Sequence, residues 1–394
     1  MTYTVGMVGP IELAQFRDLL HPAAWSDKLP SGLGGPPVDL LSRELLSRGR
    51  RLLVVTLDRH VKDEVILEGP HLKICFGPFR EVDRAHDFFA AERAYLLRVL
   101  RRERPEVVHA QWTYEFALAA QASGLPHVIT AHDAPLNVLR HNFIPYRIAR
   151  TLMAYRVLSR AKRVVSVSPY VAQHLSRFML YRGPQDVIPN GMPEGLFAAR
   201  LPPRVLGRPL TFASILQGWG NIKNGRVAIE AFAAVRHNHP EARLILFGYG
   251  HGPGEDAQHW ARAHGLIDGI EFAGRIAYAN LIDRLAREVD VLVHPALEEA
   301  FGMVLIEAMA LGLPVIAGEA SGGPRWVLDD GRAGILVDVT DPRAVARAMT
   351  RLAESAQERE TWGQRGLELA TRRYHIRHVA DVYERIYAEL FETR

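Results

Sequence analysis

The fold is decided by the stretch from His294 to Ala317, which reads HPALEEAFGMVLIEAMALGLPVIA. It follows the apolar run from Val289 to Pro295, whose β-branched residues predict a buried parallel strand. A helix is predicted from about Met303 to Leu311, because Gly312 and then Pro314 stop it. A strand, a loop and a helix in this succession indicate a parallel sheet covered by helices.

Two carboxylates lie eight positions apart in this stretch, Glu299 in the loop and Glu307 within the helix. Glu307 has apolar neighbours on nearly every side, and a buried carboxylate is costly unless hydrogen bonds reach it. The hydroxyls of a bound sugar or ribose would supply them, and the amides at the start of the helix would bind an anion. Taken alone, Glu299 also fits a helix cap, and Glu307 a salt bridge to one of many arginines. The pair with its flanking residues favours a site for a sugar nucleotide.

The pattern Glu299-x7-Glu307, with Phe301-Gly302 inside it and Gly-Leu-Pro-Val after it, resembles the motif of the retaining GT-B glycosyltransferases of family 4. The resemblance covers essentially the whole chain. It implies an α/β fold of the GT-B type, in which two Rossmann-like domains face each other across a cleft, with a helical C-terminal tail. Glu299 would then bind the donor sugar and act in catalysis, and Glu307 would bind the ribose. The segment assigned to donor binding comprises Phe301, Gly302, Met303 and Val304.

Composition agrees with an ordinary soluble chain of two domains. The 394 residues are 48% hydrophobic and 23% charged, and a chain of this length exceeds one typical core. The single cysteine, Cys75, fits a reducing compartment. The start of the chain resembles a first strand and not a signal peptide, and no apolar run is long enough to span a bilayer, so we expect a cytoplasmic protein. The net charge is +4, but no basic cluster is interleaved with stacking aromatics, so nucleic-acid binding is not expected.

Short apolar runs alternate with helical patterns along the chain, which predicts two parallel sheets. The strands predicted in the first half are Tyr3–Gly9, Arg51–Leu57, Leu72–Phe76, Val107–Trp112, His127–His132, Arg163–Ser168 and Asp186–Pro189. Those predicted in the second half are Leu210–Leu216, Ala242–Gly248, Ile270–Ala273, Val289–His294, Pro314–Ala317 and Gly334–Val337.

The segment Pro189–Pro203 is dense in proline and glycine and predicts a linker. We therefore expect an N-terminal acceptor-side domain over residues 1–195 and a nucleotide-sugar-binding domain over residues 205–375. A last helix, in residues 376–394, is expected to pack back towards the N-terminal domain.

Lys223 lies in a glycine-bearing loop that opens a predicted helix, where backbone amides can meet phosphate. The loop resembles the family's diphosphate clamp, in which a lysine and an upstream arginine hold the donor. Here Gln217 or Gly218 stands where the arginine is expected. This departure leaves open whether catalysis is impaired.

Four further residues are donor-site candidates by resemblance, and His132 is a catalytic candidate. Gly250 lies in a Gly-x-Gly-Pro-like turn, and Arg275 lies in the segment that meets the nucleotide base. Gly34 and Gly35 resemble the family's Gly-Gly loop at the diphosphate, although a plain turn fits equally well. His132, at a predicted strand end, matches the family's histidine that contacts the transferred sugar, and a structural role is the alternative.

Neither an Asp-x-Asp motif nor a set with metal-ligand spacing is apparent in the sequence, so no metal and no cofactor are expected. Lysine, arginine and helix amides would offset the charge of the leaving diphosphate. The basic segment 143–163 fits contact with an anionic membrane surface, although a solvated basic helix face is the more ordinary interpretation.

The motifs thus predict a metal-independent transfer of a hexose from a nucleoside diphosphate sugar to a hydroxyl acceptor. The resemblance to the family implies that the transfer retains configuration and that the acceptor is a cell-envelope polysaccharide or a glycolipid. The alternatives are a GT-B epimerase or sugar phosphorylase, and a sugar-nucleotide-binding protein without turnover. The donor sugar, the base (uridine or guanosine), the acceptor and the oligomeric state stay open.

Overall fold

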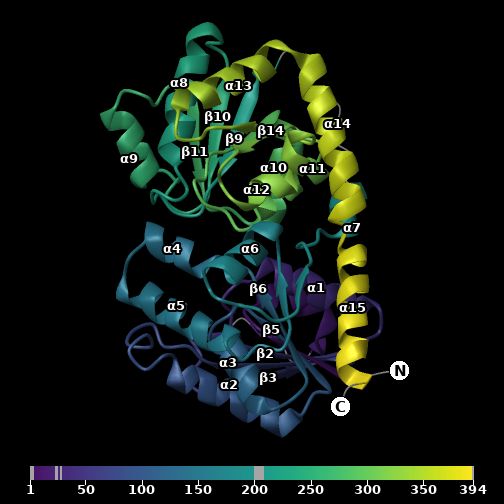
Figure 1. Cartoon of the computed structure of the whole chain (residues 1–394). Helices are drawn as coiled ribbons and strands as arrows, with labels where there is room; N and C mark the ends of the chain where they lie inside the picture. The colour runs from purple at the N-terminus through teal and green to yellow at the C-terminus, as the bar shows by residue number, and fades with distance from the viewer. Residues whose placement is uncertain (1–3, 23–24, 27–28, 199–207, 393–394) are drawn as a thin grey trace. The chain divides into compact units, whose positions relative to one another are not determined.

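The computed structural model describes residues 4–22, 25–26, 29–198 and 208–392. The chain divides into two compact units. Unit 1 comprises Met1–Gly191 and Ile376–Arg394, and unit 2 comprises Met192–His375. Each unit contains one mainly parallel sheet with helices (Figure 1), which confirms the predicted α/β class.

The sheet of unit 1 has the strand order β3-β4-β2-β1-β5-β6-β7-β8. Its strands are β1 (Thr4–Val8), β2 (Arg51–Asp58), β3 (Val65–Glu68), β4 (Leu72–Pro78), β5 (Val107–Gln111), β6 (His127–Ala131), β7 (Val164–Ser166) and β8 (Gln185–Val187). Its helices are η1 (Leu13–Leu19), α1 (Pro36–Ser47), α2 (Ala90–Glu103), α3 (Glu115–Ser123), α4 (Pro135–His141), α5 (Pro145–Leu158), α6 (Pro169–Arg177) and α15 (Ile376–Glu392).

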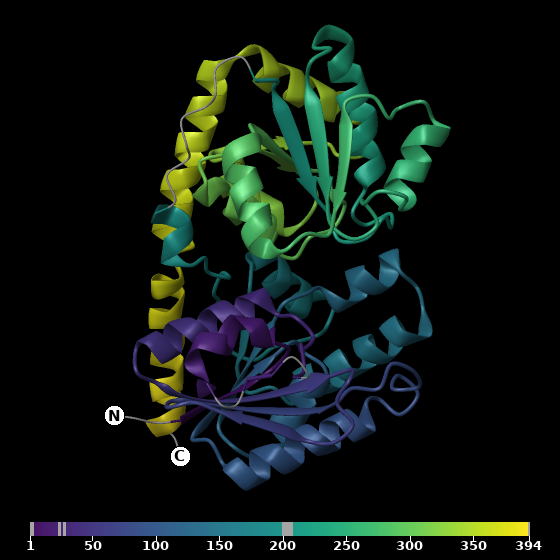
Figure 2. The same ribbon diagram turned by 180° about the vertical axis from the view of Figure 1, so that it is seen from behind.

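Helices cover both faces of this sheet, and Figure 2 shows α1 on one side and α2 on the other. Strands β2 and β5 are buried at almost every position, as expected of parallel strands with both faces covered. The last helix, α15, belongs to unit 1 and packs against α1 and β5. Arg48, the residue that follows α1, forms ion pairs of 2.7 Å with Asp381 and with Glu384 of α15.

The sheet of unit 2 has the order β11-β10-β9-β12-β13-β14 and is parallel at every described pair. Its strands are β9 (Thr211–Ile215), β10 (Arg243–Phe247), β11 (Ile270–Gly274), β12 (Val291–His294), β13 (Val315–Gly318) and β14 (Ile335–Val337). Its helices are α7 (Glu194–Ala198), α8 (Gly225–Asn238), α9 (Asp256–Ala263), α10 (Tyr278–Glu288), α11 (Met303–Ala310), α12 (Gly323–Val327), η3 (Asp329–Gly331), α13 (Pro342–Glu354) and α14 (Ala356–Arg373).

Two local features differ from the sequence-based expectation. The strand β3 was not predicted, and it pairs antiparallel with β4 at the edge of the sheet. The predicted linker 189–203 contains the short helix α7 (Glu194–Ala198), while residues 199–203 lie outside the described part. In the described ranges, no helix has the length and hydrophobicity that crossing a bilayer requires.

Candidate functional site

The loop between β12 and α11 in unit 2 ends at Gly302. Gly302 has φ +92, a left-handed conformation that glycine adopts without strain. A Cβ there would lie 2.9 Å from Leu305 Cδ1, so a side chain would require this leucine to move. The first amides of a helix have no acceptor inside the helix. The amides of Met303 and Val304 therefore provide a point where an anion can bind.

Glu299 lies in the same loop, and its backbone is fixed from both sides. Its amide donates to the Ser321 carbonyl at 2.9 Å, and its carbonyl accepts from the Gly323 amide at 2.8 Å. Its carboxylate accepts a 2.7 Å hydrogen bond from Lys223 Nζ, and His294 Nε2 lies 3.5 Å from the same oxygen. Burial alone would raise the pKa of Glu299, but Lys223 and His294 lower it to about 2. Glu299 is therefore ionised at neutral pH and can only accept hydrogen bonds.

Lys223 reaches this carboxylate because its loop is tied to the loop that carries Glu299. The Leu297 amide donates to the Ile222 carbonyl at 2.8 Å, directly beside Lys223. Lys223 and Glu299 are 76 positions apart in the chain, and the fold brings them into one ion pair. The sequence motifs named both residues but did not predict this contact.

Glu307 occupies a different environment in the fifth position of α11. It is 6% exposed, among apolar residues of the same helix. Burial raises its pKa to about 7, although a hydrogen bond from the Tyr278 hydroxyl lowers it. Tyr278 opens α10, and nothing in the local sequence around Glu307 pointed to this partner. The pKa of Glu307 is thus raised towards neutral pH, whereas that of Glu299 is lowered.

The turn after β10 lies against the loop that carries Lys223. Gly248 has φ +109, and a Cβ there would lie 1.9 Å from the Leu216 carbonyl oxygen, so the tight connection requires glycine. Gly250 has φ +83, and its Cβ would lie 3.0 Å from the Trp219 amide nitrogen. Arg275 follows β11 and is exposed to solvent.

The sequence also singled out Phe301 and the position of Gln217 and Gly218 in unit 2. The Phe301 ring is 3% exposed, and it contacts the rings of Trp326 and Tyr374 at centroid distances of 6.2 and 5.8 Å. Only its backbone is therefore available for a ligand. Gln217, which stands near the position of the expected arginine, is exposed, and the Gly218 amide donates to the Tyr249 carbonyl at 2.8 Å.

In unit 1, the Gly34–Gly35 loop presents bare backbone before α1. Gly34 has φ +74 and open space around the position of a Cβ, and its amide donates to the Ile11 carbonyl at 3.0 Å. A Cβ at Gly35 would lie 2.2 Å from the Pro10 carbonyl oxygen. Nearby, the buried Asp39 accepts a 3.1 Å hydrogen bond from the Glu12 amide. Burial raises the pKa of Asp39 to about 8.

His132 follows β6, and the ring of Trp112 lies against it. The two ring centroids are 4.3 Å apart, and Trp112 has φ +63, a strained conformation for a bulky residue. Burial lowers the pKa of His132 to about 3, so the ring is neutral at physiological pH. Its Nε2 lies 2.7 Å from Gln111 Oε1 and therefore carries the proton that it donates.

A buried chain of hydrogen bonds continues from Gln111 to α15. Gln111 Nε2 lies 3.1 Å from Met7 Sδ and 3.1 Å from His109 Nε2. Sulfur is an acceptor, so this contact fixes the orientation of the amide. His109 Nε2 then accepts, and His109 Nδ1 donates to the Tyr387 hydroxyl at 2.7 Å. Gln111 and Tyr387 were not predicted from the sequence, because no motif connects them with His132.

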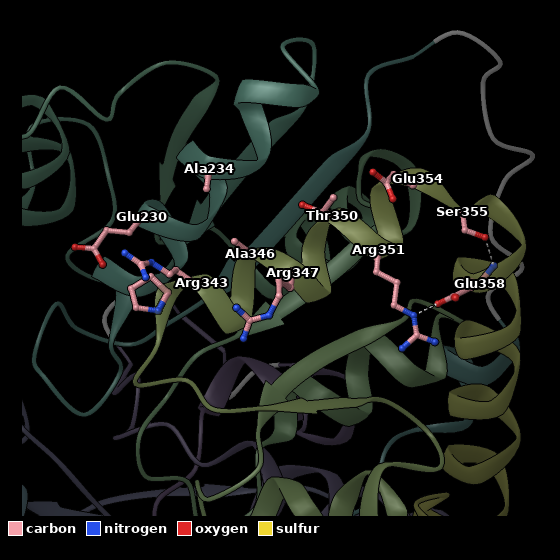
Figure 3. A pocket seen from close by; sticks show the side chains of 11 residues that line it. Glu230, Ala234, Arg343, Ala346, Arg347, Thr350, Arg351, Glu354, Ser355 and Glu358 are labelled. Carbon is pink, nitrogen blue, oxygen red and sulfur yellow. Dashed lines mark hydrogen bonds and ion pairs between the residues drawn. The ribbon is translucent and has the colours of Figure 1, made fainter.

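Figure 3 shows a groove of about 600 Å³ between α8 and α13 in unit 2. It contains no residue that the sequence predicted for ligand binding. Two of its arginines are ion-paired, Arg351 with Glu358 and Arg347 with Asp341. Elsewhere in the described ranges, no three His, Cys, Asp or Glu side chains meet in a way that could hold a metal ion.

Comparison with known proteins gives two family matches. Residues 38–194 match the model described as Glycosyltransferase Family 4, and residues 220–369 match Glycosyl transferases group 1. The D-inositol 3-phosphate glycosyltransferase of Stackebrandtia nassauensis is 29% identical over 81% of this chain and 77% of its own. The chain spans about half the length of most such relatives, for example 42% of the enzyme of the same name from Corynebacterium kroppenstedtii, with 32% identity over 46% of this chain.

Solved structures share the fold. The sucrose-phosphate synthase of Thermosynechococcus elongatus has a TM-score of 0.79 at 19% identity, with both chains fully covered. Anabaena HepE, solved with UDP and glucose, has a TM-score of 0.69 at 18% identity over 98% of this chain and 99% of its own. The two family matches together span most of the chain, which belongs to the GT-B glycosyltransferases of family 4 and group 1.

Proposed function

We propose that this protein transfers a hexose from a nucleoside diphosphate sugar to a hydroxyl acceptor, with retention of configuration and without a metal ion. Family membership supports the transferase activity. The related fold of HepE, solved with UDP and glucose, supports a nucleotide-sugar donor. The acceptor class, a cell-envelope polysaccharide or glycolipid, follows only from the family resemblance.

The single observation that carries the proposal is the ion pair between Lys223 and Glu299. Glu299 lies in the loop that leads to the start of α11. A donor has negative phosphates beside a sugar rich in hydroxyls. Lys223 and the amides of Met303 and Val304 suit the phosphates, and the ionised Glu299 suits the hydroxyls. Glu307 lies in the middle of the same helix, and it would bind the ribose.

The remaining candidates have supporting roles in this proposal. Gly250 and Arg275 would flank the phosphates and the base. In unit 1, Gly34 and Gly35 would leave room for phosphate and sugar to approach the backbone, and His132 would contact the transferred sugar.

The transfer itself needs no covalent intermediate with the protein. The bond from the anomeric carbon to the β-phosphate oxygen breaks, and the acceptor oxygen forms its bond on the same face. The acceptor proton passes to the leaving phosphate. The charge that develops on this phosphate would be stabilised by Lys223 and by the helix amides.

Binding and turnover of single variants test the proposal. Calorimetry with UDP and GDP comes first, followed by product analysis with intact donors. Lys223→Ala and Glu299→Ala should each lose most of the turnover. Lys62→Ala and Glu319→Ala remove an exposed lysine and an exposed carboxylate, and they serve as matched controls. Near-normal rates in both site variants would defeat the assignment.

A second candidate is a protein that binds a sugar nucleotide without turnover. The observation in its favour is Gln217 or Gly218 in the place of the family's arginine. Binding of UDP or GDP with no product from any donor and acceptor would support it. Phosphorolysis or epimerisation without an acceptor would indicate instead a sugar phosphorylase or an epimerase.

A further inference from the structure

Unit 1 contains a pocket of about 690 Å³ that the proposed function does not use. It lies among α2, α3, the end of α5 and the turn before β6. Figure 1 shows these three helices beside one another in unit 1. His127, the first residue of β6, lines the pocket, whereas His132 follows the last residue of that strand. The pocket therefore lies at the N-terminal ends of the strands, whereas His132 lies at their C-terminal ends, roughly 16 Å away along β6.

The lining of this pocket is strongly basic. Arg93 of α2, Arg156 and Arg160 at the end of α5, and Lys162 all contribute to it, and no Asp or Glu is among the described lining residues. Arg163 also lines the pocket, but it is ion-paired with two carboxylates outside. In the described part of the chain, the other four cations make no ion pair. The carboxylates of Asp87 and Glu92 act on Arg93 from outside the lining. The remaining like charges repel one another where they converge, which is unfavourable.

The inner wall shows the same imbalance. Arg93 Nε is buried without a hydrogen-bond partner. Burial, and to a smaller extent the charge of Arg156, lower the pKa of Arg93, while the charges of Asp87 and Glu92 act in the opposite direction. A bound anion would relieve this repulsion, and a small movement of the side chain would give the Nε–H an acceptor.

The pocket is also partly apolar, through Leu118, Leu125, Pro126 and Leu390. Leu152 is 52% exposed one turn before Arg156, on the same face of α5. By contrast, Arg150 turns inward, where its guanidinium carbon lies 3.7 Å from the centroid of the Tyr114 ring. The basic segment therefore presents its free charges towards its C-terminal end, next to the pocket.

We propose that this basic pocket binds the phosphate group of an anionic ligand, whose apolar part lies against the leucine-rich wall. The phosphate could come from the headgroup of an anionic lipid or from a soluble phosphate ester. Arginines suit phosphate because the guanidinium presents several donors in a fixed plane. The proposal does not depend on the donor site around Lys223.

Two double variants of the full chain test it. Arg156→Gln with Arg160→Gln removes two exposed charges from the pocket. Arg262→Gln with Arg385→Gln removes the same charge from exposed positions elsewhere, as a control. The probes are pyrophosphate, measured by calorimetry, and vesicles of phosphatidylcholine with phosphatidylglycerol, measured by co-sedimentation. Every protein used for calorimetry also carries Lys223→Ala, so that binding of pyrophosphate at the proposed donor site does not contribute to the signal.

We expect the pocket variant to bind its probe roughly 25-fold more weakly, since each arginine near an anionic surface contributes about fivefold. The control should bind as the unsubstituted chain does. A loss seen only with vesicles identifies a lipid headgroup, and a loss with pyrophosphate identifies a soluble phosphate. The proposal is overturned if neither probe binds, if the pocket variant binds normally, or if the control loses as much.

Discussion

Replacement of Glu307 by glutamine should make the protein more stable at alkaline pH, although it removes a proposed ligand contact. The pKa of Glu307 is about 7 in the folded chain, against a usual value of 4.5. Between pH 4.5 and about 7, the folded protein therefore retains a proton on Glu307 that the unfolded chain releases. Unfolding becomes easier as the pH rises, and the full difference corresponds to about 3 kcal/mol.

Glutamine has nearly the same shape and does not titrate, so the variant escapes this loss. The free energy of unfolding of Glu307→Gln, relative to the unsubstituted protein, should increase by about 2 to 3 kcal/mol between pH 5 and pH 8. Urea unfolding followed by the fluorescence of the six tryptophans measures this difference. The exposed Glu319→Gln is the control and should show no such trend.

As the pH rises, the affinity of the unsubstituted protein for nucleotide should increase relative to that of Glu307→Gln, although its relative stability decreases. Ribose hydroxyls donate to an ionised carboxylate, so the ratio of UDP or GDP affinities, unsubstituted protein to Glu307→Gln, should increase as the pH passes 7. The ratio cancels the titration of the nucleotide's own phosphates. A stability difference that stays constant from pH 5 to pH 8 would refute the reasoning, because Glu307 would then be ionised throughout.

Three further substitutions give distinct outcomes. Lys223→Ala should reduce turnover about 100-fold or more, measured with saturating donor, because in the proposed transfer its charge stabilises the leaving diphosphate. Gly302→Ala should lower the free energy of unfolding by about 1 to 3 kcal/mol in urea, because the residue has φ +92. Gln111→Leu should reduce kcat about tenfold with unchanged affinity for UDP and GDP, because His132 loses the hydrogen-bond partner of its Nε2. Tyr387→Phe should reduce kcat by a smaller factor. A change in nucleotide affinity in place of a change in kcat would contradict this positioning role.

The strands of both sheets could be predicted from the sequence because parallel strands covered on both faces are continuous apolar runs. The strand β3 escaped because it lies at an edge and alternates between exposed and buried residues. The helix α7 escaped because its five residues lie in a stretch dominated by proline and glycine. In both cases the local sequence pattern is weak, and tertiary contacts determine the secondary structure.

For the site, the sequence named the residues but not their partners. The motif spacing pointed to Glu299 and Glu307, and the loop composition pointed to Lys223. Their pKa values differ because one carboxylate meets an ammonium group from a distant loop, whereas the other meets the neutral hydroxyl of Tyr278. Such contacts depend on the fold and cannot be derived from spacing along the chain.

The Lys223–Glu299 ion pair has a consequence for which ligand binds best. A bare nucleoside diphosphate that attracts Lys223 takes away the ammonium partner of Glu299 and leaves a partly buried carboxylate with His294 beside it, which is costly. An intact donor supplies phosphate to Lys223 and, at the same time, sugar hydroxyls to Glu299. We therefore expect the affinity for a correct donor, relative to its bare diphosphate, to fall in Glu299→Ala, since the variant no longer has a carboxylate to satisfy. Titration of both ligands into both proteins measures this ratio, and an unchanged ratio would mean that Glu299 does not contact the sugar.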